Sequence, residues 1–206
     1  MKSIQSSSPV QADLPVRERI MAAGKKLFAS QGFENTSTAS IVKAARTSES
    51  QLFKHFHDKE GLLEAIFQNG WNRLSFVLTA SKIAHTPQEK LKMILELMIN
   101  ALASDPEMRD LMLLEGRRIR KVGGRILVTN GYAEFSQFIE DIVKDLQTQG
   151  RLVPELSIAA VRTILVGTFE SMMREQVLSY RGVSGAALKT EEIRAGFEIV
   201  LKAVLR

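Results

Sequence analysis

Residues 37–59 read STASIVKAARTSESQLFKHFHDK, and this stretch decides the fold. Ser37 carries a side-chain oxygen that can cap a helix start, and apolar residues then recur at helical spacing. Residues 46–48 interrupt that spacing, and Ser48 can cap a second helix. The apolar stripe of this second helix is Leu52, Phe53 and Phe56. Two short helices joined by so few residues must cross steeply, which predicts a helix-turn-helix whose second helix fits a DNA major groove.

The residues on either side complete a three-helix unit. A helix is predicted over residues 16–30, where apolar residues recur on one buried face, and Gly32 ends it. Asp58 can cap a long helix that begins at once and runs to about residue 83. The free N–H groups at the start of that helix, with Lys59 beside them, suit a phosphate.

Several short sequence patterns lie close together between Ile20 and Glu60. They are the apolar positions Ile20, Ala23, Leu27 and Phe28, the turn Gly32-Phe33, the start Thr36-Ser37, and the run Leu52-Phe53-Lys54-His55-Phe56 with Asp58-Lys59-Glu60 behind it. In combination they resemble the N-terminal DNA-binding domain of the TetR-like (tetracycline-repressor-like) transcriptional regulators, from Arg17 to about Phe67. The resemblance implies a one-component regulator, a repressor that a small-molecule ligand releases from an inverted-repeat operator in double-stranded DNA.

Three positions differ from the family pattern. The family usually has Gly where Arg46 stands, often has Gly at Ser50, and usually has Tyr at Phe53, whose hydroxyl contacts a phosphate. Either Arg46 is forced to a positive φ, at a cost on the order of 1 kcal/mol, or the turn differs from that of the family. These differences keep a rival interpretation open, a helical small-molecule sensor or carrier with lost or altered DNA binding. An enzyme on a helical bundle is the least favoured interpretation, because no catalytic constellation stands out.

Side-chain length and hydrogen-bonding groups sort the predicted DNA contacts. Gln51 and Lys54 are long enough, with donors, to read a purine edge in the major groove. Ala39 could at most touch a thymine methyl group. Phosphate contacts, which set register without reading sequence, are predicted for Ser37, Thr38, Ser48, His55 and Lys59. The full predicted set is Ser37, Thr38, Ala39, Ser48, Glu49, Ser50, Gln51, Phe53, Lys54, His55 and Lys59.

The composition favours a folded helical protein and excludes several chemistries. Hydrophobic residues make up 45% of the 206 residues and aromatic residues only 6%, which favours helices over aromatic-rich strands. The absence of Cys excludes disulfides and thiolate chemistry, and neither a metal site nor a cofactor is predicted. No apolar run could span a bilayer and no signal-peptide core is present, so we expect a cytoplasmic protein without a membrane partner. Residues 1–60 hold nine basic and six acidic side chains, so the basic excess leans toward the predicted DNA-binding end.

The predicted fold class is all-α, in three parts. Residues 1–15 are Ser-rich and aperiodic and are predicted to be a disordered tail. Residues 16–68 are predicted to form the helix-turn-helix domain, with its motif at 37–56, and residues 69–206 a helical ligand-binding and dimerisation domain. Within this last domain, further helices are predicted over residues 87–102, from 106, and over 125–149, 157–180 and 190–205.

Residues 157–180 are apolar on more than one side, so the helix predicted there is buried on two faces. One face can meet its own domain and the other a second copy, which predicts a two-fold homodimer through a four-helix interface. The residues predicted for that interface are Val161, Leu165, Phe169, Met173, Val177, Phe197, Val200 and Leu201. An apolar small-molecule effector is predicted to bind between the helices of the bundle. The residues predicted to contact it are Trp71, Met98, Met112, Glu115, Phe135, Phe138, Phe169 and Met172.

Overall fold

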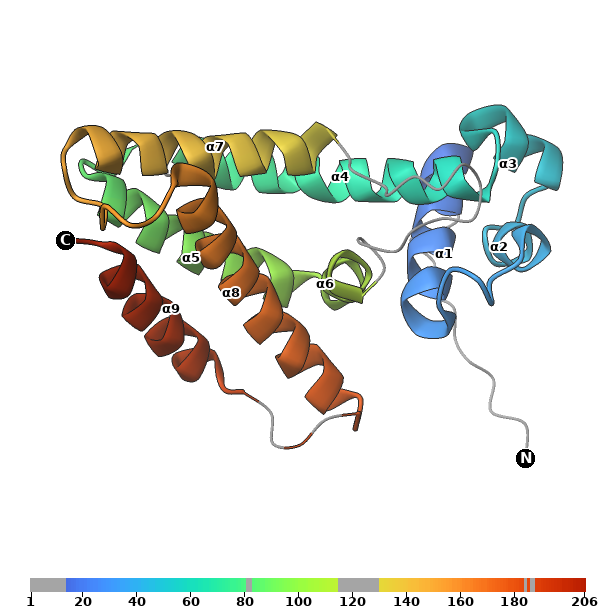
Figure 1. The fold of residues 1–206 in the computed structure, drawn as a ribbon. Coiled ribbons are helices and arrows are strands. Elements are labelled where there is room, and N and C mark those ends of the chain that lie inside the picture. Colours follow the sequence, from blue (N-terminus) through green and yellow to red (C-terminus); the bar gives the residue numbers. More distant parts are fainter. Residues whose placement is uncertain (1–13, 81–82, 115–129, 184, 186–187) are drawn as a thin grey trace. The chain divides into compact units, whose positions relative to one another are not determined.

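The computed structural model describes residues 14–80, 83–114, 130–183, 185 and 188–206 (Figure 1). Over these residues the chain is helical and has no β-strand, which confirms the all-α prediction. The helices are α1 (Val16–Gln31), α2 (Thr38–Ala44), α3 (Glu49–Phe56), α4 (Lys59–Ala80), α5 (Pro87–Ser104), α6 (Pro106–Leu114), α7 (Asn130–Thr148), α8 (Ile158–Tyr180) and α9 (Thr190–Val204). Most of the predicted tail, and the start of the helix predicted at residue 125, lie outside the described residues.

The chain divides into two compact units, residues 1–66 and 67–206. The division falls inside α4, which therefore belongs to both units. The boundary placed after residue 68 from the sequence lies in this same helix.

The first unit packs α1 against α2 and α3, and α2 against α3. Its core is made of side chains that are at most 4% exposed: Ile20, Phe28, Phe33, Ile41, Leu52, Phe56, Leu62, Leu63 and Ile66. Phe53 departs from the predicted apolar stripe, because its side chain is 47% exposed. Leu52 and Phe56 already provide the buried face of α3, and Phe53, about 100° around the helix from Leu52, lies at the edge of that face.

A tight corner joins α3 to α4. His57 ends α3 with a φ of 69°, and the predicted cap at Asp58 is confirmed, since its Oδ1 accepts a hydrogen bond from the Gly61 backbone N–H at 2.6 Å. A Cβ atom at Gly61 would lie 2.1 Å from the Phe56 carbonyl oxygen, far inside van der Waals contact. Only glycine therefore lets the end of α3 come so close to the first turn of α4, and this contact helps to fix the direction of α3.

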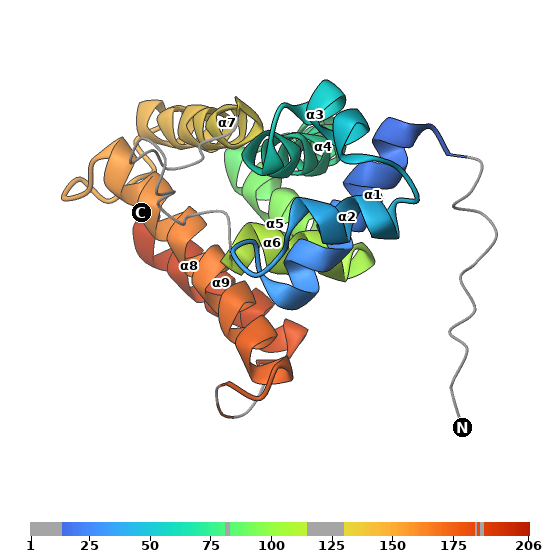
Figure 2. The same cartoon turned by 90° about the vertical axis from the view of Figure 1, so that its right-hand side faces the viewer.

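The second unit is a helical bundle built on α5, α7, α8 and α9. α8 packs against α6, α7 and α9, and α5 packs against α6, α7 and α9. Figures 1 and 2 both show α8 and α9 side by side. Thr86 and Glu89 form a capping box at the start of α5, and the hydrogen bond from the Thr86 backbone N–H holds the pKa of the Glu89 carboxyl below its ordinary value. The Ser157 hydroxyl likewise accepts a hydrogen bond from the Ala160 N–H at the start of α8.

Candidate functional sites

The turn between α2 and α3 is closed by two backbone hydrogen bonds. The Thr47 N–H donates to the Val42 carbonyl at 3.0 Å, and the Arg46 N–H donates to the Lys43 carbonyl at 3.3 Å. Such a pair of bonds defines a Schellman motif, in which the residue just past the helix takes a left-handed conformation. Arg46 has a φ of 50°, so of the two alternatives at this position, a left-handed arginine or a different turn, the structure has the left-handed arginine. The turn thus has the left-handed backbone conformation that glycine adopts most easily, and arginine adopts it at a cost of about 1 kcal/mol.

α3 presents a polar face away from its buried side. The exposed side chains are Glu49, Ser50, Phe53 and Lys54. Gln51 and His55 are half-buried, so they leave the helix at the border between the core and the exposed face. Of the two side chains predicted to read bases, Lys54 is therefore exposed and Gln51 lies beside the core.

Two polar pairs hold the first turn of α3. The hydroxyl of Thr38, at the start of α2, donates to the Glu49 carboxylate at 2.8 Å. The Ser48 and Ser50 hydroxyls share a hydrogen bond of 2.8 Å. Ser48 occupies the cap position, but its side chain makes no cap hydrogen bond, so the predicted side-chain cap is wrong. The Glu49 carboxylate stays at the helix N-terminus, where the helix dipole favours a negative charge.

The starts of α2 and α3 lie together, because the Thr38–Glu49 hydrogen bond joins them. The Ser37 hydroxyl caps α2 as predicted, accepting a hydrogen bond from the Ser40 N–H at 3.1 Å. Ala39, in the first turn of α2, is exposed. The predicted DNA-contacting residues at the two helix starts therefore gather on one part of the first unit.

Lys59, also predicted to contact a phosphate, has its partners inside the first unit. Its ammonium donates to the Phe33 carbonyl at 2.9 Å and to the Thr36 carbonyl at 3.0 Å. It also lies 4.3 Å from the centre of the Phe33 ring. These contacts tie the start of α4 to the connection between α1 and α2. Lys59 therefore contributes to the stability of the first unit, and its phosphate contact stays a prediction.

The second unit contains an apolar cavity of about 30 Å³. Three of the residues predicted to contact an effector line it, Met98, Phe135 and Phe169. The sequence did not single out the other lining residues as pocket residues: Leu91, Ile94, Leu95, Ile139, Leu165, Val166 and Phe197. The available signal was the stripe of α5 at residues 91, 94, 95 and 98, whose spacing equally describes ordinary core.

The remaining residues predicted for the effector do not line this cavity. Trp71 packs behind one wall of the cavity. The centroid of its ring lies 5.5 Å from that of the lining residue Phe135 and 5.7 Å from that of Tyr132. Three others are partly buried against the surrounding core: Met112, Phe138 and Met172. Glu115 lies outside the described residues.

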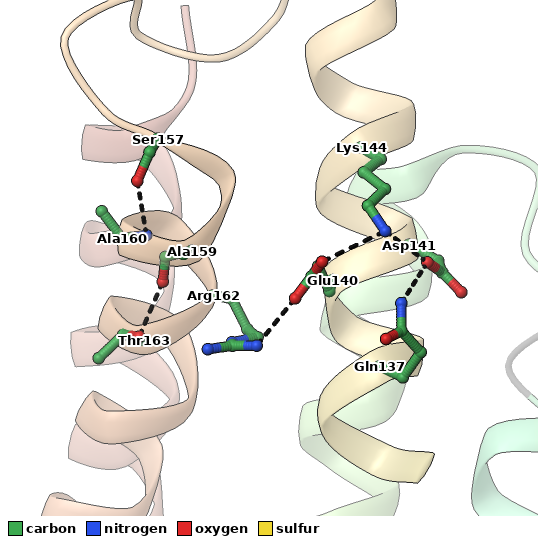
Figure 3. A network of polar contacts seen from close by, with 9 residues as sticks. All are labelled: Gln137, Glu140, Asp141, Lys144, Ser157, Ala159, Ala160, Arg162 and Thr163. Carbon is green, nitrogen blue, oxygen red and sulfur yellow. Dashed lines mark hydrogen bonds and ion pairs between the residues drawn. The ribbon is translucent and has the colours of Figure 1, made fainter. Parts of the chain in front are cut away.

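A second hollow, a groove of about 300 Å³, lies between α7 and α8. Its walls mix polar and apolar side chains: Tyr132, Ala133 and Ser136 from α7, and Arg162, Thr163, Val166 and Gly167 from α8. The Arg162 guanidinium donates to the Glu140 carboxylate at 2.8 Å (Figure 3). Glu140 lies one turn beyond Ser136 on α7, so this ion pair stands at one end of the groove.

Glu140 has a second cationic partner. The Lys144 ammonium lies 3.2 Å from the Glu140 carboxylate and 3.2 Å from the Asp141 carboxylate, and Figure 3 shows the four charged side chains as one chain of contacts. The hydrogen bond to Glu140, with a second to Asp141, raises the pKa of Lys144 above its ordinary value. The hydrogen bond from Gln137, with one from Lys144, lowers the pKa of Asp141. Lys144 and Asp141 are thus stabilised in their ionised forms.

Two family models match the chain. Residues 20–66 match the model of bacterial regulatory proteins of the tetR family. Residues 74–190, more than half of the chain, match the model of the C-terminal region of YsiA-like protein. The chain belongs to the tetR family of bacterial regulatory proteins. It is therefore a DNA-binding transcription regulator, and the resemblance of its N-terminal residues to that family is confirmed.

Relatives of this tetR-family regulator agree with the assignment. The HTH-type transcriptional regulator UidR of Escherichia coli (strain K12) is 26% identical over 153 residues, which cover 74% of this chain and 76% of UidR. The structure of the fatty acid degradation regulator FadR from Bacillus halodurans has a TM-score of 0.74 at 19% identity, covering 95% of this chain and 94% of that one. FadR from Bacillus subtilis, solved in complex with stearoyl-CoA, has a TM-score of 0.72 at 18% identity, with coverages of 90% and 95%. At such identities the two solved structures show a shared fold.

The residues predicted for the dimer interface of this regulator require a correction. Seven of them are at most 7% exposed within a single chain: Val161, Leu165, Phe169, Met173, Val177, Phe197 and Leu201. They form part of the core of the second unit, so a second copy would have almost none of their surface left to cover. Val200 is half-buried. The outward side of α9 instead carries Ile199, which is 68% exposed, with the exposed Ala195 and Ala203 one turn away on either side.

The described part of the chain holds neither a candidate membrane span nor a candidate metal cluster. None of the described helices combines the length and apolar character that a bilayer crossing demands. Nor do the described His, Asp and Glu side chains gather in threes as ligands for a metal ion.

Proposed function

We propose that this regulator represses transcription as a two-fold dimer on an inverted-repeat operator, and that a small molecule with an apolar chain releases it. The observation that carries the proposal is the exposed polar face of α3. This helix is held before its start by the turn at Arg46 and after its end by the corner at Gly61. A short helix fixed at both ends with one polar side turned outward suits insertion into a major groove. The basic excess of residues 1–60 favours approach to phosphates.

Individual residues of this face have separate proposed roles. Gln51 and Lys54 read purine edges, and each good pairing of this kind contributes about 1–3 kcal/mol of discrimination. The exposed ring of Phe53 offers an apolar contact for a thymine methyl group. Ser37 and His55 contact phosphates and set the register.

Rival classes of function receive less support. A sensor or carrier without DNA binding was suggested by the departures at Arg46, Ser50 and Phe53. However, Arg46 adopts the left-handed conformation that the turn requires, so the helix-turn-helix geometry is kept. We propose no catalytic activity, because the curated relatives are regulators. Since the proposed partner is DNA, we propose that the protein works in the cytoplasm.

Two copies are proposed to meet through the outward sides of α8 and α9, with Ile199 near the contact. Burial of an exposed apolar side chain favours association, and a two-fold axis would place the two copies of α3 on half-sites that recur on one face of the duplex. Substitutions at Val177 or Phe197 would not test this interface, because both side chains lie in the core of one chain.

The effector is proposed to occupy the apolar cavity. FadR from Bacillus subtilis was solved with stearoyl-CoA, which carries a long apolar chain. At about 30 Å³ the cavity has room for about one water, so an apolar chain can enter only if side chains such as Met98 move. A ligand that binds only one conformation of the second unit shifts the population toward that conformation. α4 runs from one unit into the other, and through it the change would reach the first unit and oppose DNA binding reciprocally.

Selection of bound duplexes from a random DNA library tests the DNA-binding part of the proposal. We expect enrichment of an inverted repeat, and we expect Gln51→Ala to lose about 1–3 kcal/mol at one base pair of each half-site and to relax preference there. Gln147→Ala, which changes an exposed glutamine of α7, is the matched control and should bind as the wild type does. Failure to enrich any sequence, or an equal loss by Gln51→Ala on operator and scrambled DNA, would contradict the proposed reading role.

A further inference from the structure

The groove between α7 and α8 and the apolar cavity share one wall. Val166 lines both of them. On α7, Phe135 and Ile139 line the cavity, whereas Ser136 lines the groove. A Cβ atom at Gly167 would meet no atom within 4 Å, so the groove is open beside Val166. A molecule lying in the groove is therefore separated from the cavity by about one layer of side chains.

Arg162 places a cation at one end of this groove. Its side chain is 33% exposed, and its NH1 donates to the Glu140 Oε2 at 2.8 Å. A guanidinium has five N–H donors in a planar fork that matches carboxylate or phosphate oxygens. An acidic group that enters the groove lies beside a guanidinium with more donors than its hydrogen bond to Glu140 uses.

Glu140 would keep a partner if Arg162 turned to such a group. The Lys144 ammonium lies 3.2 Å from the Glu140 Oε1, the oxygen that Arg162 does not contact. The exchange would therefore break one partly exposed ion pair, an interaction that water screens strongly, and would leave no carboxylate without a cation. Figure 3 shows Arg162 and Lys144 reaching Glu140 from two sides.

We propose that this groove is the entry and head-group site for an anionic amphiphile. The acidic group binds Arg162 in place of Glu140, and the alkyl chain passes Val166 into the apolar cavity. The inference rests on the effector-responsive function proposed above and specifies its ligand, an alkyl chain that carries a carboxylate or a phosphate. A neutral or cationic head group would leave Arg162 paired with Glu140 and would bind more weakly.

Trp71 is the only tryptophan of the chain and stands against Phe135 at the cavity wall, so its fluorescence reports binding in the full-length protein. The probes are laurate, lauroyl-CoA, dodecanol and dodecyltrimethylammonium. We expect laurate or lauroyl-CoA to bind about tenfold or more tightly than the neutral and cationic probes, since a charge-assisted hydrogen bond supplies a difference of that order. Tighter binding of laurate would identify a carboxylate, and tighter binding of lauroyl-CoA the phosphates of the coenzyme.

Variants separate recognition from folding. Arg162→Gln should weaken the better anionic probe by about tenfold and leave dodecanol unchanged. Arg181→Gln removes another arginine–carboxylate pair, the one with Asp110 at 2.6 Å, and should bind as the wild type does. Glu140→Gln should tighten binding of the anion, because it frees Arg162, an effect that a purely structural ion pair would not give. Wild-type affinity of Arg162→Gln for the anion, or weaker binding by Glu140→Gln, would overturn the proposal.

Operator binding is measured separately from probe binding. Together the two measurements distinguish a failure of the groove site from a failure of the proposed regulatory function. If an anionic probe binds with the expected dependence on Arg162 but leaves operator affinity unchanged, the groove site stands and the release mechanism fails. If no anionic probe binds while the operator is still recognised, the groove site fails and the DNA-binding function stands.

Discussion

Lys59→Met tests whether Lys59 serves the first unit or a DNA phosphate. The substitution keeps an unbranched side chain only one atom shorter and removes its charge. Two hydrogen bonds are lost, to the Phe33 and Thr36 carbonyls, and each contributes about 1 kcal/mol net. Loss of the contact with the Phe33 ring removes about 0.5 kcal/mol more. We therefore expect the unfolding free energy of the first unit to fall by about 2–3 kcal/mol.

Native-state hydrogen exchange of the amides in α1, α2 and α3 measures the stability of this unit by itself. A salt series of DNA-binding measurements reports the number of phosphates that are neutralised. Lys59→Met should lower the protection of the amides and keep the salt slope of the remaining folded protein. Lys54→Met, at an exposed lysine of α3, is the control and should keep the protection while it weakens operator binding. The reasoning is refuted if Lys59→Met keeps wild-type protection and lowers the salt slope by about one.

Three further predictions concern positions with defined geometry. Gly61→Ala should destabilise the first unit by about 3 kcal/mol or more in the same exchange experiment, because its Cβ would meet the Phe56 carbonyl oxygen; unchanged protection would contradict the close contact. Arg46→Gly should raise the unit's stability by up to about 1 kcal/mol, since relief of the left-handed strain outweighs the added flexibility of the unfolded chain; a loss of stability would disprove this. Ile199→Asp should shift sedimentation from dimer to monomer, whereas Ile83→Asp, at an equally exposed isoleucine, should not; a dimeric Ile199→Asp protein would move the interface elsewhere.

The sequence by itself determined the architecture of the first unit. The caps at Ser37 and Asp58 were predicted from residues a few positions apart, and the structure confirms them, whereas the side-chain cap predicted at Ser48 was wrong. A helix-turn-helix is encoded this way because its caps, its turn and its apolar spacing are local properties of the chain. The family could be recognised for the same reason, since its marks lie within about fifty consecutive residues.

Only the tertiary structure decided what individual apolar and charged side chains do. Apolar spacing showed that Leu165 and Phe197 are buried, but not that they line a cavity inside one chain instead of an interface between two. Likewise, Lys59 has the chemistry of a phosphate ligand, and only the fold brings two carbonyls from the α1–α2 connection to its ammonium. Arg162 and Glu140 are 22 residues apart and meet because α7 packs against α8. Such pairings depend on how helices dock over long sequence separations, and no local pattern of residues contains that information.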